Sequence, residues 1–220
     1  MTRLELARMI DHSVLKPEAT ERDIRAGAEV VRQWHIGFYC VQPCWVKLAT
    51  QALIGCDARV VAVVGFPHGC DLPEIKAGAA STAIVDGAAE IDMVMNFGAL
   101  KSGDASMVAK DIEAVVRGAP GIPVKVILEA TALTDAEKRL ACRLARDAGA
   151  QFVKTSTGFH PSGGATVADV RLLRQEVGPN IGVKASGGIR TLADAQAMIA
   201  AGANRIGTSA SVAMLAAIEG

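Results

Sequence analysis

The sequence predicts an α/β fold of the (β/α)8 type, a TIM barrel formed by residues 1–220 as a single domain. Short runs of apolar and β-branched residues alternate with longer helical patterns, and eight such pairs fill the chain with compact βα repeats. Several runs, such as 59–65 and 90–96, are almost continuously apolar, as expected of parallel strands covered by helices. No linker, charge block or low-complexity tract divides the chain, so one domain accounts for the whole pattern.

The predicted strands follow one another at short intervals. They span 9–12, 37–41, 59–65, 90–96, 123–129, 151–155, 181–185 and 204–207. Helices are predicted to start where Thr or Asp is followed three residues later by an acidic residue, the pattern of a capping box: Thr20, Asp71, Thr134 and Thr191. Helices are predicted to end at glycines, which tolerate the left-handed backbone conformation: Gly87, Gly149 and Gly202.

A weak internal repeat supports the barrel. Each of these three glycines precedes an alanine and then a strand, and the fifth position after the glycine is Asp92, Lys154 or Gly207. Because the repeats share one frame, we expect these positions at similar heights in their strands. In a barrel enzyme that height lies near the C-terminal rim, which carries the active site.

A doubly wound parallel sheet is the alternative fold. Such sheets usually carry a glycine-rich phosphate loop after the first strand. Here the first two strands are followed by His-Ser-Val-Leu-Lys-Pro and Gln-Pro-Cys-Trp, which contain no glycine. The barrel is therefore favoured.

The composition argues against several classes of protein. Lys and Arg total 23 and Asp and Glu total 23, so no global charge attracts nucleic acid or an anionic membrane. Aromatic residues make up only 4%, too few for a base-stacking platform. No run approaches the ~18 apolar residues of a membrane span, and no secretory signal is recognisable. The five cysteines are scattered, so we expect reduced thiols and a cytoplasmic protein.

Lysines occur inside three apolar strands, where an unpaired ammonium is costly to bury. They are Lys125, Lys154 and Lys184. A single strand lysine is explained by a salt bridge or by a side chain that reaches solvent. Two of them near the C-terminal ends of neighbouring strands indicate Schiff-base chemistry, because desolvation and a cationic neighbour make a lysine nucleophilic. Asp92 is either their structural ion partner or a proton-transfer group.

Glycines next to predicted helix starts indicate a phosphate site. Gly187 and Gly188 follow the seventh strand, and Gly207 and Ser209 follow the eighth. Backbone N–H groups at helix N-termini bind phosphate, and barrel enzymes often use the loops after strands seven and eight for it. Gly158, after the sixth strand, completes the predicted cradle. A Gly-Gly pair by itself is more often only a turn.

The remaining reactive side chains do not indicate a metal site. None of the histidines has the spacing of a ligand pair: His12, His35, His68 and His160. The cysteines supply no zinc cluster either. Cys40 closes a predicted strand and is expected to be a buried, inert thiol unless it reaches the pocket.

Six segments match motifs of one known family. They are Ile-Asp-His-x-x-Leu-Lys-Pro at 10–17, Gly-Phe-Pro at 65–67, Glu-Ile-Asp-Met-Val at 90–94, Val-Lys-Thr-Ser-Thr-Gly-Phe at 153–159, Val-Lys-Ala-Ser-Gly-Gly-Ile-Arg at 183–190 and Arg-Ile-Gly-Thr-Ser at 205–209. Together they resemble the deoxyribose-phosphate aldolase family over nearly the whole chain. The resemblance implies a (β/α)8 class I aldolase that reversibly cleaves 2-deoxy-D-ribose 5-phosphate into acetaldehyde and D-glyceraldehyde 3-phosphate, without metal or organic cofactor.

The resemblance also implies roles for individual residues. Lys154 resembles the lysine that forms the Schiff base, Lys184 its activating partner and Asp92 the acidic member of the proton relay. The predicted cradle falls where the family holds phosphate, and Asp11 and Lys125 fall at supporting pocket positions. Because the family is often dimeric, a homo-oligomer is expected, with a dimer favoured.

Departures from the family pattern are modest. Ser13 stands where the family often has Thr, and Ala130 follows Glu129 where Thr is common. Some members use a C-terminal tyrosine in proton transfer, whereas Tyr39 is the only tyrosine of this sequence. A water held by Asp92 and Lys184 is therefore expected to protonate the enamine.

Two other functions remain open from the residues alone. A phosphosugar isomerase or epimerase would use the phosphate site but would not need two buried lysines. A non-catalytic sugar-phosphate sensor would bind its ligand without a covalent adduct.

Overall fold

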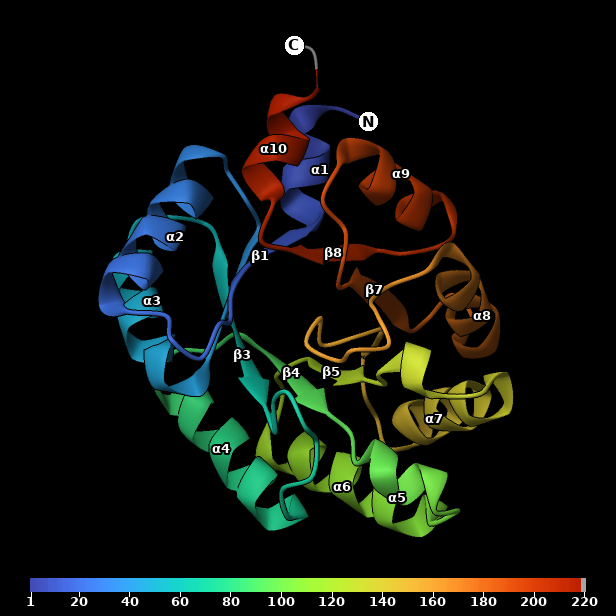
Figure 1. Ribbon diagram of the computed structural model, residues 1–220. Coiled ribbons are helices and arrows are strands. Elements are labelled where there is room, and N and C mark those ends of the chain that lie inside the picture. The colour runs from blue at the N-terminus through green and yellow to red at the C-terminus, as the bar shows by residue number, and fades with distance from the viewer. Residues whose placement is uncertain (219–220) are drawn as a thin grey trace.

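A computed structural model describes residues 1–218 and confirms the predicted barrel. Eight parallel strands close into a ring in sequence order, each hydrogen-bonded to the next and β8 to β1 (Figure 1). The strands are β1 (Ile10–Val14), β2 (Phe38–Val41), β3 (Arg59–Val64), β4 (Glu90–Val94), β5 (Val124–Ile127), β6 (Phe152–Lys154), β7 (Gly182–Ser186) and β8 (Arg205–Thr208). Every strand expected from the sequence is present, and β1 extends two residues further than predicted.

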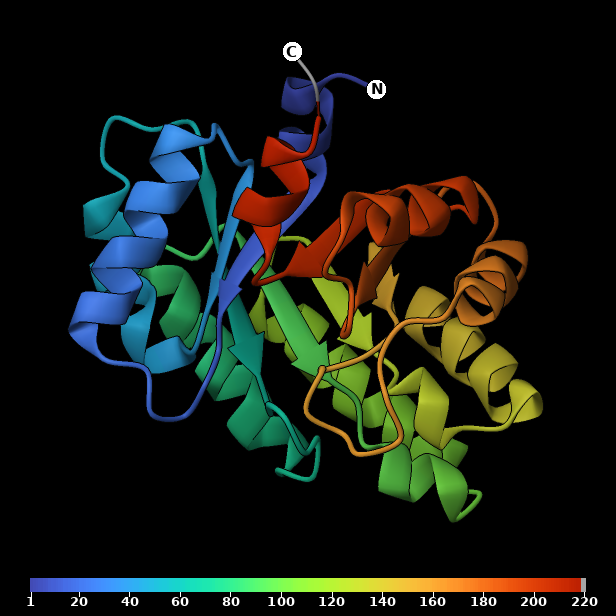
Figure 2. The same ribbon diagram turned by 45° about the horizontal axis from the view of Figure 1, so that its top comes forward.

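Helices surround the ring on its outer side (Figures 1 and 2). They are α1 (Arg3–Met9), α2 (Glu21–Gln33), α3 (Val46–Ala52), α4 (Pro73–Val85), α5 (Phe97–Lys101), α6 (Ala105–Gly118), α7 (Asp135–Asp147), α8 (Val167–Val177), α9 (Leu192–Ala200) and α10 (Ser211–Ala216), with 3-10 turns η1 (Pro43–Trp45) and η2 (Ala130–Ala132). The helix α1 before the first strand was not expected from the repeat. It packs beside α10 and starts with its own capping box at Thr2.

Most of the predicted helix boundaries are confirmed. Thr20, Thr134 and Thr191 each accept a hydrogen bond from the backbone three residues later, within complete capping boxes. The prediction at Asp71 is wrong, because α4 starts at Pro73 after Leu72, and the fixed φ of proline suits the first helical position without any side-chain cap. The three predicted terminal glycines all have φ between 89° and 114°, the conformation that glycine tolerates best.

Two different interiors result from this arrangement. Between the strands and the helices lies the main apolar core, rich in Ala, Val, Ile and Leu. Inside the ring, a small apolar wall of Cys40, Val61 and Val63 occupies only the side formed by β2 and β3. Lysines, acids and an arginine from the other strands fill the rest of the barrel interior. Charged groups at such depth need partners, and the register of the strands supplies them.

The strand register brings the charged residues together inside the barrel. Asp92 on β4 pairs in register with Lys125 on β5, and Lys154 on β6 pairs with Lys184 on β7. On the far side of the ring, Asp11 on β1 pairs with Gly207 on β8. Residues paired across neighbouring strands share a face, so these side chains all project into the barrel.

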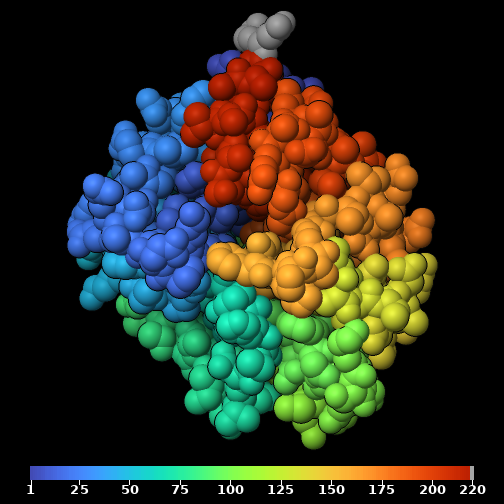
Figure 3. Space-filling model, viewed as in Figure 1, coloured from blue at the N-terminus to red at the C-terminus, as the bar shows by residue number. Residues whose placement is uncertain are grey.

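The segment between β6 and α8 lies across the mouth of the barrel. Figure 3 shows it in light orange over the centre of this face, between the blue N-terminal part and the green middle of the chain. Phe159 in this segment meets Phe66, which follows β3, edge to face with ring centroids 5.3 Å apart. Among residues 1–218, no helix has the length and apolar character needed to cross a membrane.

Candidate active site

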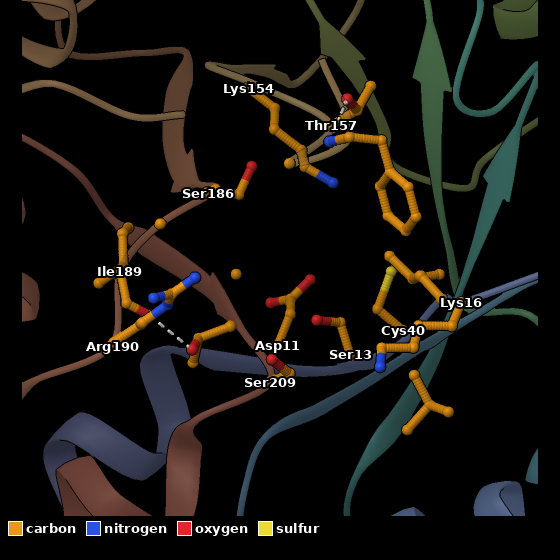
Figure 4. Close-up of a pocket in the computed structure, with 18 of the residues that line it drawn as sticks. Asp11, Ser13, Lys16, Cys40, Lys154, Thr157, Ser186, Ile189, Arg190 and Ser209 are labelled. Atoms are coloured by element: carbon orange, nitrogen blue, oxygen red, sulfur yellow. Dashed lines mark hydrogen bonds between the residues drawn. The ribbon is translucent and has the colours of Figure 1, made fainter. Parts of the chain in front are cut away.

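A cavity of about 690 Å³ opens at the C-terminal end of the barrel. Its walls come from the ends of β1, β2, β6, β7 and β8 and from the loops that follow them. Figure 4 shows Lys154 and Asp11 directed into the same space, with Cys40 and Ser13 on one side and Arg190 on the other. Volumes of this size suit a small metabolite.

The predicted site residues occupy two levels of this cavity. Its lining includes Asp11, Lys154, Lys184 and the whole predicted phosphate cradle: Gly158, Gly187, Gly188, Gly207 and Ser209. Asp92 and Lys125 do not line it. Both are fully buried beneath the floor of the cavity, where they contact the residues above them.

Asp92 links the two lysines of the cavity. Its Oδ2 atom accepts hydrogen bonds from Lys154 Nζ at 2.8 Å and from Lys184 Nζ at 2.6 Å. Its other oxygen, Oδ1, accepts one from Lys125 Nζ at 2.9 Å. One carboxylate therefore neutralises charge from three strands.

Six of the buried charges form a closed ring, which we call the charge ring: Asp11, Lys184, Asp92, Lys125, Glu90 and Arg205. Anions and cations alternate around it. Lys184 bridges Asp11 and Asp92, and Lys125 bridges Asp92 and Glu90. Arg205 closes the ring, with Nη1 2.9 Å from Asp11 Oδ1 and 3.2 Å from Glu90 Oε2.

The charge ring is neutral when all of its members are ionised, because three carboxylates face three cations. Lys154 lies outside it and pairs only with Asp92, whose Oδ2 it shares with Lys184. The charge ring and Lys154 together therefore hold four cations and three carboxylates, and the additional cation is the amine that projects into the cavity.

Asp92 and Asp11 are held in their ionised form. Burial alone would raise the pKa of the Asp92 carboxyl, but Lys125, Lys154 and Lys184 together hold it well below its ordinary value. Asp11 behaves in the same way: burial opposes its charge, yet Lys184 and the other ring cations lower its pKa overall. For Lys184, burial disfavours the ammonium, but Asp11 and Asp92 outweigh that effect and raise its pKa. Lys184 is therefore a permanent cation beside Lys154.

Glycines shape the opposite end of the cavity. Gly158, Gly187 and Gly188 have φ of 84°, 87° and 77°, so only glycine holds the turns after β6 and β7 without strain. The turns also approach closely, since a Cβ on Gly187 would lie 3.3 Å from the Gly158 Cα. Gly207 does something different. A Cβ there would come within 3.2 Å of Lys184 Cε, so its absence leaves room for the lysine side chain.

A further buried acid, missed in the sequence, fixes the turn after Lys154. Glu129 follows β5 in the left-handed region, with φ 56°, and its side chain is buried. Its Oε2 accepts a hydrogen bond from Thr157 Oγ1 at 2.5 Å, and both oxygens lie 3.3 Å from Thr157 N. Thr157 lines the cavity and accepts a hydrogen bond from Phe159 N, so Glu129 anchors the turn that contains Gly158.

The cavity is also lined by polar, charged and thiol side chains outside the predicted site. Lys16, Ser13 and Arg190 line it and were not predicted. Cys40 also reaches the cavity, where burial raises the pKa of its thiol to about 11 and keeps it protonated. Tyr39 does not reach it, because its hydroxyl is buried and donates to Ile24 O.

Glu90 and Arg205 are the other members of the charge ring that the sequence analysis did not predict as site residues. Both occur inside predicted strands in the same way as Asp92 and Lys184, so charged residues in apolar strands were the signal available for them. Within residues 1–218, no three His, Cys, Asp or Glu side chains are grouped in a way that would hold a metal ion.

Comparison with known proteins identifies the family. Residues 6–216 match the family model described as DeoC/LacD family aldolase. The chain belongs to this aldolase family. The match covers the barrel strands and every residue of the charge ring.

Named relatives of the chain agree with this family. It is 53% identical over 212 residues to the deoxyribose-phosphate aldolase of Streptococcus gordonii, with 96% of each chain covered. It is 51% identical over 218 residues to the protein of the same name from Enterococcus faecalis, with 99% of each covered.

Solved structures of the family share the fold closely. The structure titled QR15, an Aldolase, is 39% identical with a TM-score of 0.91, covering 96% of this chain and 94% of that one. The tetrameric deoxyribose phosphate aldolase from Aeropyrum pernix is 34% identical with a TM-score of 0.91, covering 98% and 91%.

Proposed function

We propose that this protein is a class I deoxyribose-phosphate aldolase that reversibly cleaves 2-deoxy-D-ribose 5-phosphate into acetaldehyde and D-glyceraldehyde 3-phosphate. The observation that carries the proposal is the amine of Lys154 in the cavity, sharing one Asp92 oxygen with the cation Lys184. Relatives at 51–53% identity named for this activity support it.

Lys154 is the amine best suited to attack a carbonyl. Lys125 and Lys184 each contact two carboxylates and belong to the neutral charge ring. Lys154 contacts only Asp92, so loss of its proton would balance the charges of Lys154 and the charge ring taken together. A free amine is the form that reacts with an aldehyde, and the cation Lys184 disfavours a second charge beside it.

The reaction in the cleavage direction starts with attack of Lys154 Nζ on the C1 aldehyde of the open-chain sugar. Water leaves, and the protonated imine that forms is an electron sink. A base takes the C3 hydroxyl proton and the C2–C3 bond breaks, so that D-glyceraldehyde 3-phosphate departs and an enamine remains on the lysine. Protonation at C2 and hydrolysis of the imine release acetaldehyde and restore the amine.

Asp92 is proposed as the acidic member of the proton relay, acting through a water held by Asp92 and Lys184. Because its pKa is held low, Asp92 is a carboxylate at rest. It can therefore accept a proton from that water during the reaction and return it afterwards. Asp11 orients Lys184 from the other side. Lys125 holds the second oxygen of Asp92 and keeps its carboxylate in one orientation.

The 5-phosphate is proposed to bind at the glycine end of the cavity. The turns at Gly158, Gly187 and Gly188 line the cavity before the start of α9, where backbone N–H groups would bind the phosphate, and Ser209 would add a hydroxyl. Arg190 on the same wall adds a positive charge. Such a placement sets C1 of the sugar toward Lys154 and the phosphate away from the charge ring.

Borohydride trapping tests the proposal. With acetaldehyde, reduction of the imine should leave an ethyl group on Lys154, located by peptide mass mapping. An isomerase, an epimerase or a phosphosugar sensor would form no such adduct. An adduct mainly on Lys184 or Lys125 would overturn the assigned roles, and no adduct at all would overturn the class I mechanism.

The wider setting of the protein is proposed on the same basis. Residues 1–220 would act as one catalytic domain in the cytoplasm, in keeping with five free cysteines. A homo-oligomer, with a dimer favoured, is expected, and the tetrameric title of a relative is in keeping with self-association. Sedimentation equilibrium of the purified protein would determine the number of subunits.

A further inference from the structure

Two members of the charge ring have no part in the reaction as proposed. Arg205 and Glu90 are buried, with 8% and 3% of their surfaces exposed, and neither lines the cavity. They close the lower half of the ring: Arg205 Nη2 lies 3.3 Å from Glu90 Oε1, and Glu90 Oε2 lies 2.5 Å from Lys125 Nζ. The guanidinium carbon of Arg205 also lies over the Phe38 ring, 3.3 Å from the ring centroid, in a cation–π contact.

We propose that Arg205 and Glu90 are positioning residues that set the pH range in which Lys154 forms its imine, through the charge balance of the ring. The inference rests on the proposed function, because it requires that Lys154 be the reacting amine. It assigns these two residues an electrostatic role at a distance from the substrate.

The argument follows from the alternation of charges. Arg205 restrains Asp11, which binds Lys184, and Glu90 restrains Lys125, which binds Asp92. Asp11 is thus held directly by Arg205, and Asp92 is held by Lys125, which in turn binds Glu90. Removing Arg205 leaves the ring with one excess negative charge, and removing the charge of Glu90 leaves one excess positive charge.

The titratable and charged side chains that face Lys154 and the charge ring can be named strand by strand. Charged members come from β1, β4, β5, β6, β7 and β8. On β2 the titratable group is Cys40, whose raised pKa leaves it uncharged near neutral pH. On β3 the buried inward residues are the apolar Val61 and Val63, and Arg59 at the start of this strand is exposed. Outside the strands, Glu129 after β5 is buried and bonded to Thr157, and the cavity is also lined by Lys16, Glu18, Asp23 and Arg190. All of these groups are the same in every variant of the test below, so differences between variants report on Arg205 and Glu90.

A merely structural role predicts something different. If Arg205 and Glu90 only joined strands β1, β4 and β8, then both substitutions would lower stability and activity together, without a direction in pH. An electrostatic role predicts opposite directions, because an excess negative charge favours the ammonium of the reacting lysine and an excess positive charge disfavours it.

The experiment is the pH profile of the borohydride-trapped ethyl adduct on Lys154, measured with acetaldehyde for the parent and four variants. Arg205→Met should move the midpoint to higher pH by about one unit, and Glu90→Gln should move it to lower pH by a similar amount, as expected of a buried unit charge several ångströms away at an effective dielectric constant of ~20. The double variant should return toward the parent midpoint. Arg205→Lys, which keeps the charge, should lie near the parent as well.

Val61→Ala is the matched control, since it disturbs the barrel interior without changing a charge, and its midpoint should not move. If Arg205→Met does not fold, Glu90→Gln and the double variant still carry the test through the shift and its reversal. Midpoints that stay fixed, or that move in the same direction for both single variants, overturn the proposal while the proposed function stands. A parent that forms no adduct on Lys154 overturns the proposed function, and this inference with it.

Discussion

The carboxylate of Asp92 lies 2.8 Å from the amine of Lys154, through an oxygen that it also presents to Lys184 at 2.6 Å. The two amines therefore compete for one acceptor. Lys184 has a second carboxylate, Asp11, whereas Lys154 has none. This inequality is the basis on which we propose Lys154 as the reacting amine, and the predictions below test that proposal.

Removal of each cavity lysine should have a distinct effect. Lys154→Leu should form no productive imine at any pH. Lys184→Leu should still form some, but about tenfold or more slowly near neutral pH, with a rate that climbs further into the alkaline range. Without Lys184, Asp92 has only Lys154 to pair with on that oxygen. The measurement is the pH dependence of trapped adduct. An unshifted profile for Lys184→Leu would mean that Lys184 acts only in later proton transfer or in positioning.

Asp92→Asn should damage both catalysis and stability. It removes the carboxylate shared by three lysines, so the turnover number should fall by a factor of about 10² to 10⁴, the usual contribution of a positioned proton-transfer group. Because the amines would be left with unpaired charge, the free energy of unfolding should fall by about 3–5 kcal/mol. Steady-state kinetics and denaturant unfolding measure the two effects. A variant with parent turnover would exclude Asp92 from the proton relay.

Gly188→Val should weaken binding of the phosphate selectively. Its φ of 77° disfavours any other residue, and the side chain would intrude into the cavity where we propose that the phosphate binds. The KM for 2-deoxyribose 5-phosphate should rise by tenfold or more, while the KM for deoxyribose changes little. A tenfold rise corresponds to a loss of ~1.4 kcal/mol of binding free energy.

Gly178→Val is the matched control for this test. Gly178 has a similar φ of 69° and open space around it, but it follows α8 and does not line the cavity. It should also place valine at a positive φ, but without the effect on KM. Equal losses on both sugars for Gly188→Val would point to general misfolding.

His12 should make the folded state sensitive to acid. It lies buried on β1, with Nδ1 2.7 Å from Ser211 Oγ, and burial lowers its pKa to about 4. The folded state keeps the imidazole of His12 neutral, whereas in the unfolded chain this imidazole takes up a proton as the pH falls below about 6.5. The contribution to stability is therefore fully present above about pH 6.5 and is lost as the pH falls toward 4. It should amount to roughly 3 kcal/mol over that range.

The measurement is the free energy of unfolding at several pH values for the parent and for His12→Gln, which keeps a polar group toward Ser211 but cannot titrate. The variant should lose less stability between pH ~6.5 and ~4 than the parent does. Identical slopes would show that other groups cause the acid sensitivity.

Strong chelators should leave the cleavage rate unchanged. The protonated imine already supplies the electron sink that a metal would provide in another type of aldolase. The check is the rate of acetaldehyde release before and after dialysis against a chelator. Activity that disappears and returns with Zn²⁺ or Mg²⁺ would contradict the class I mechanism.

Local sequence determined much of this protein. The eight strands and the capping boxes at Thr20, Thr134 and Thr191 depend on neighbours only a few residues apart, so the chain alone predicts them. The strand lysines were also visible, because a charge inside an apolar run is conspicuous. At Asp71 the same local rule failed, since the proline two residues later starts the helix instead.

Only the tertiary structure decided how the charges combine. Asp11 and Arg205 are 194 residues apart in the chain, yet barrel closure brings them to 2.9 Å. Nothing in a local pattern distinguishes Lys125, beneath the floor, from Lys154, in the cavity, because both are lysines in apolar strands. The difference arises from strand register and barrel closure, which give Lys125 two carboxylates and Lys154 one. Pairing of buried charges depends on distances across the fold, and those distances exist only once the ring of strands is closed.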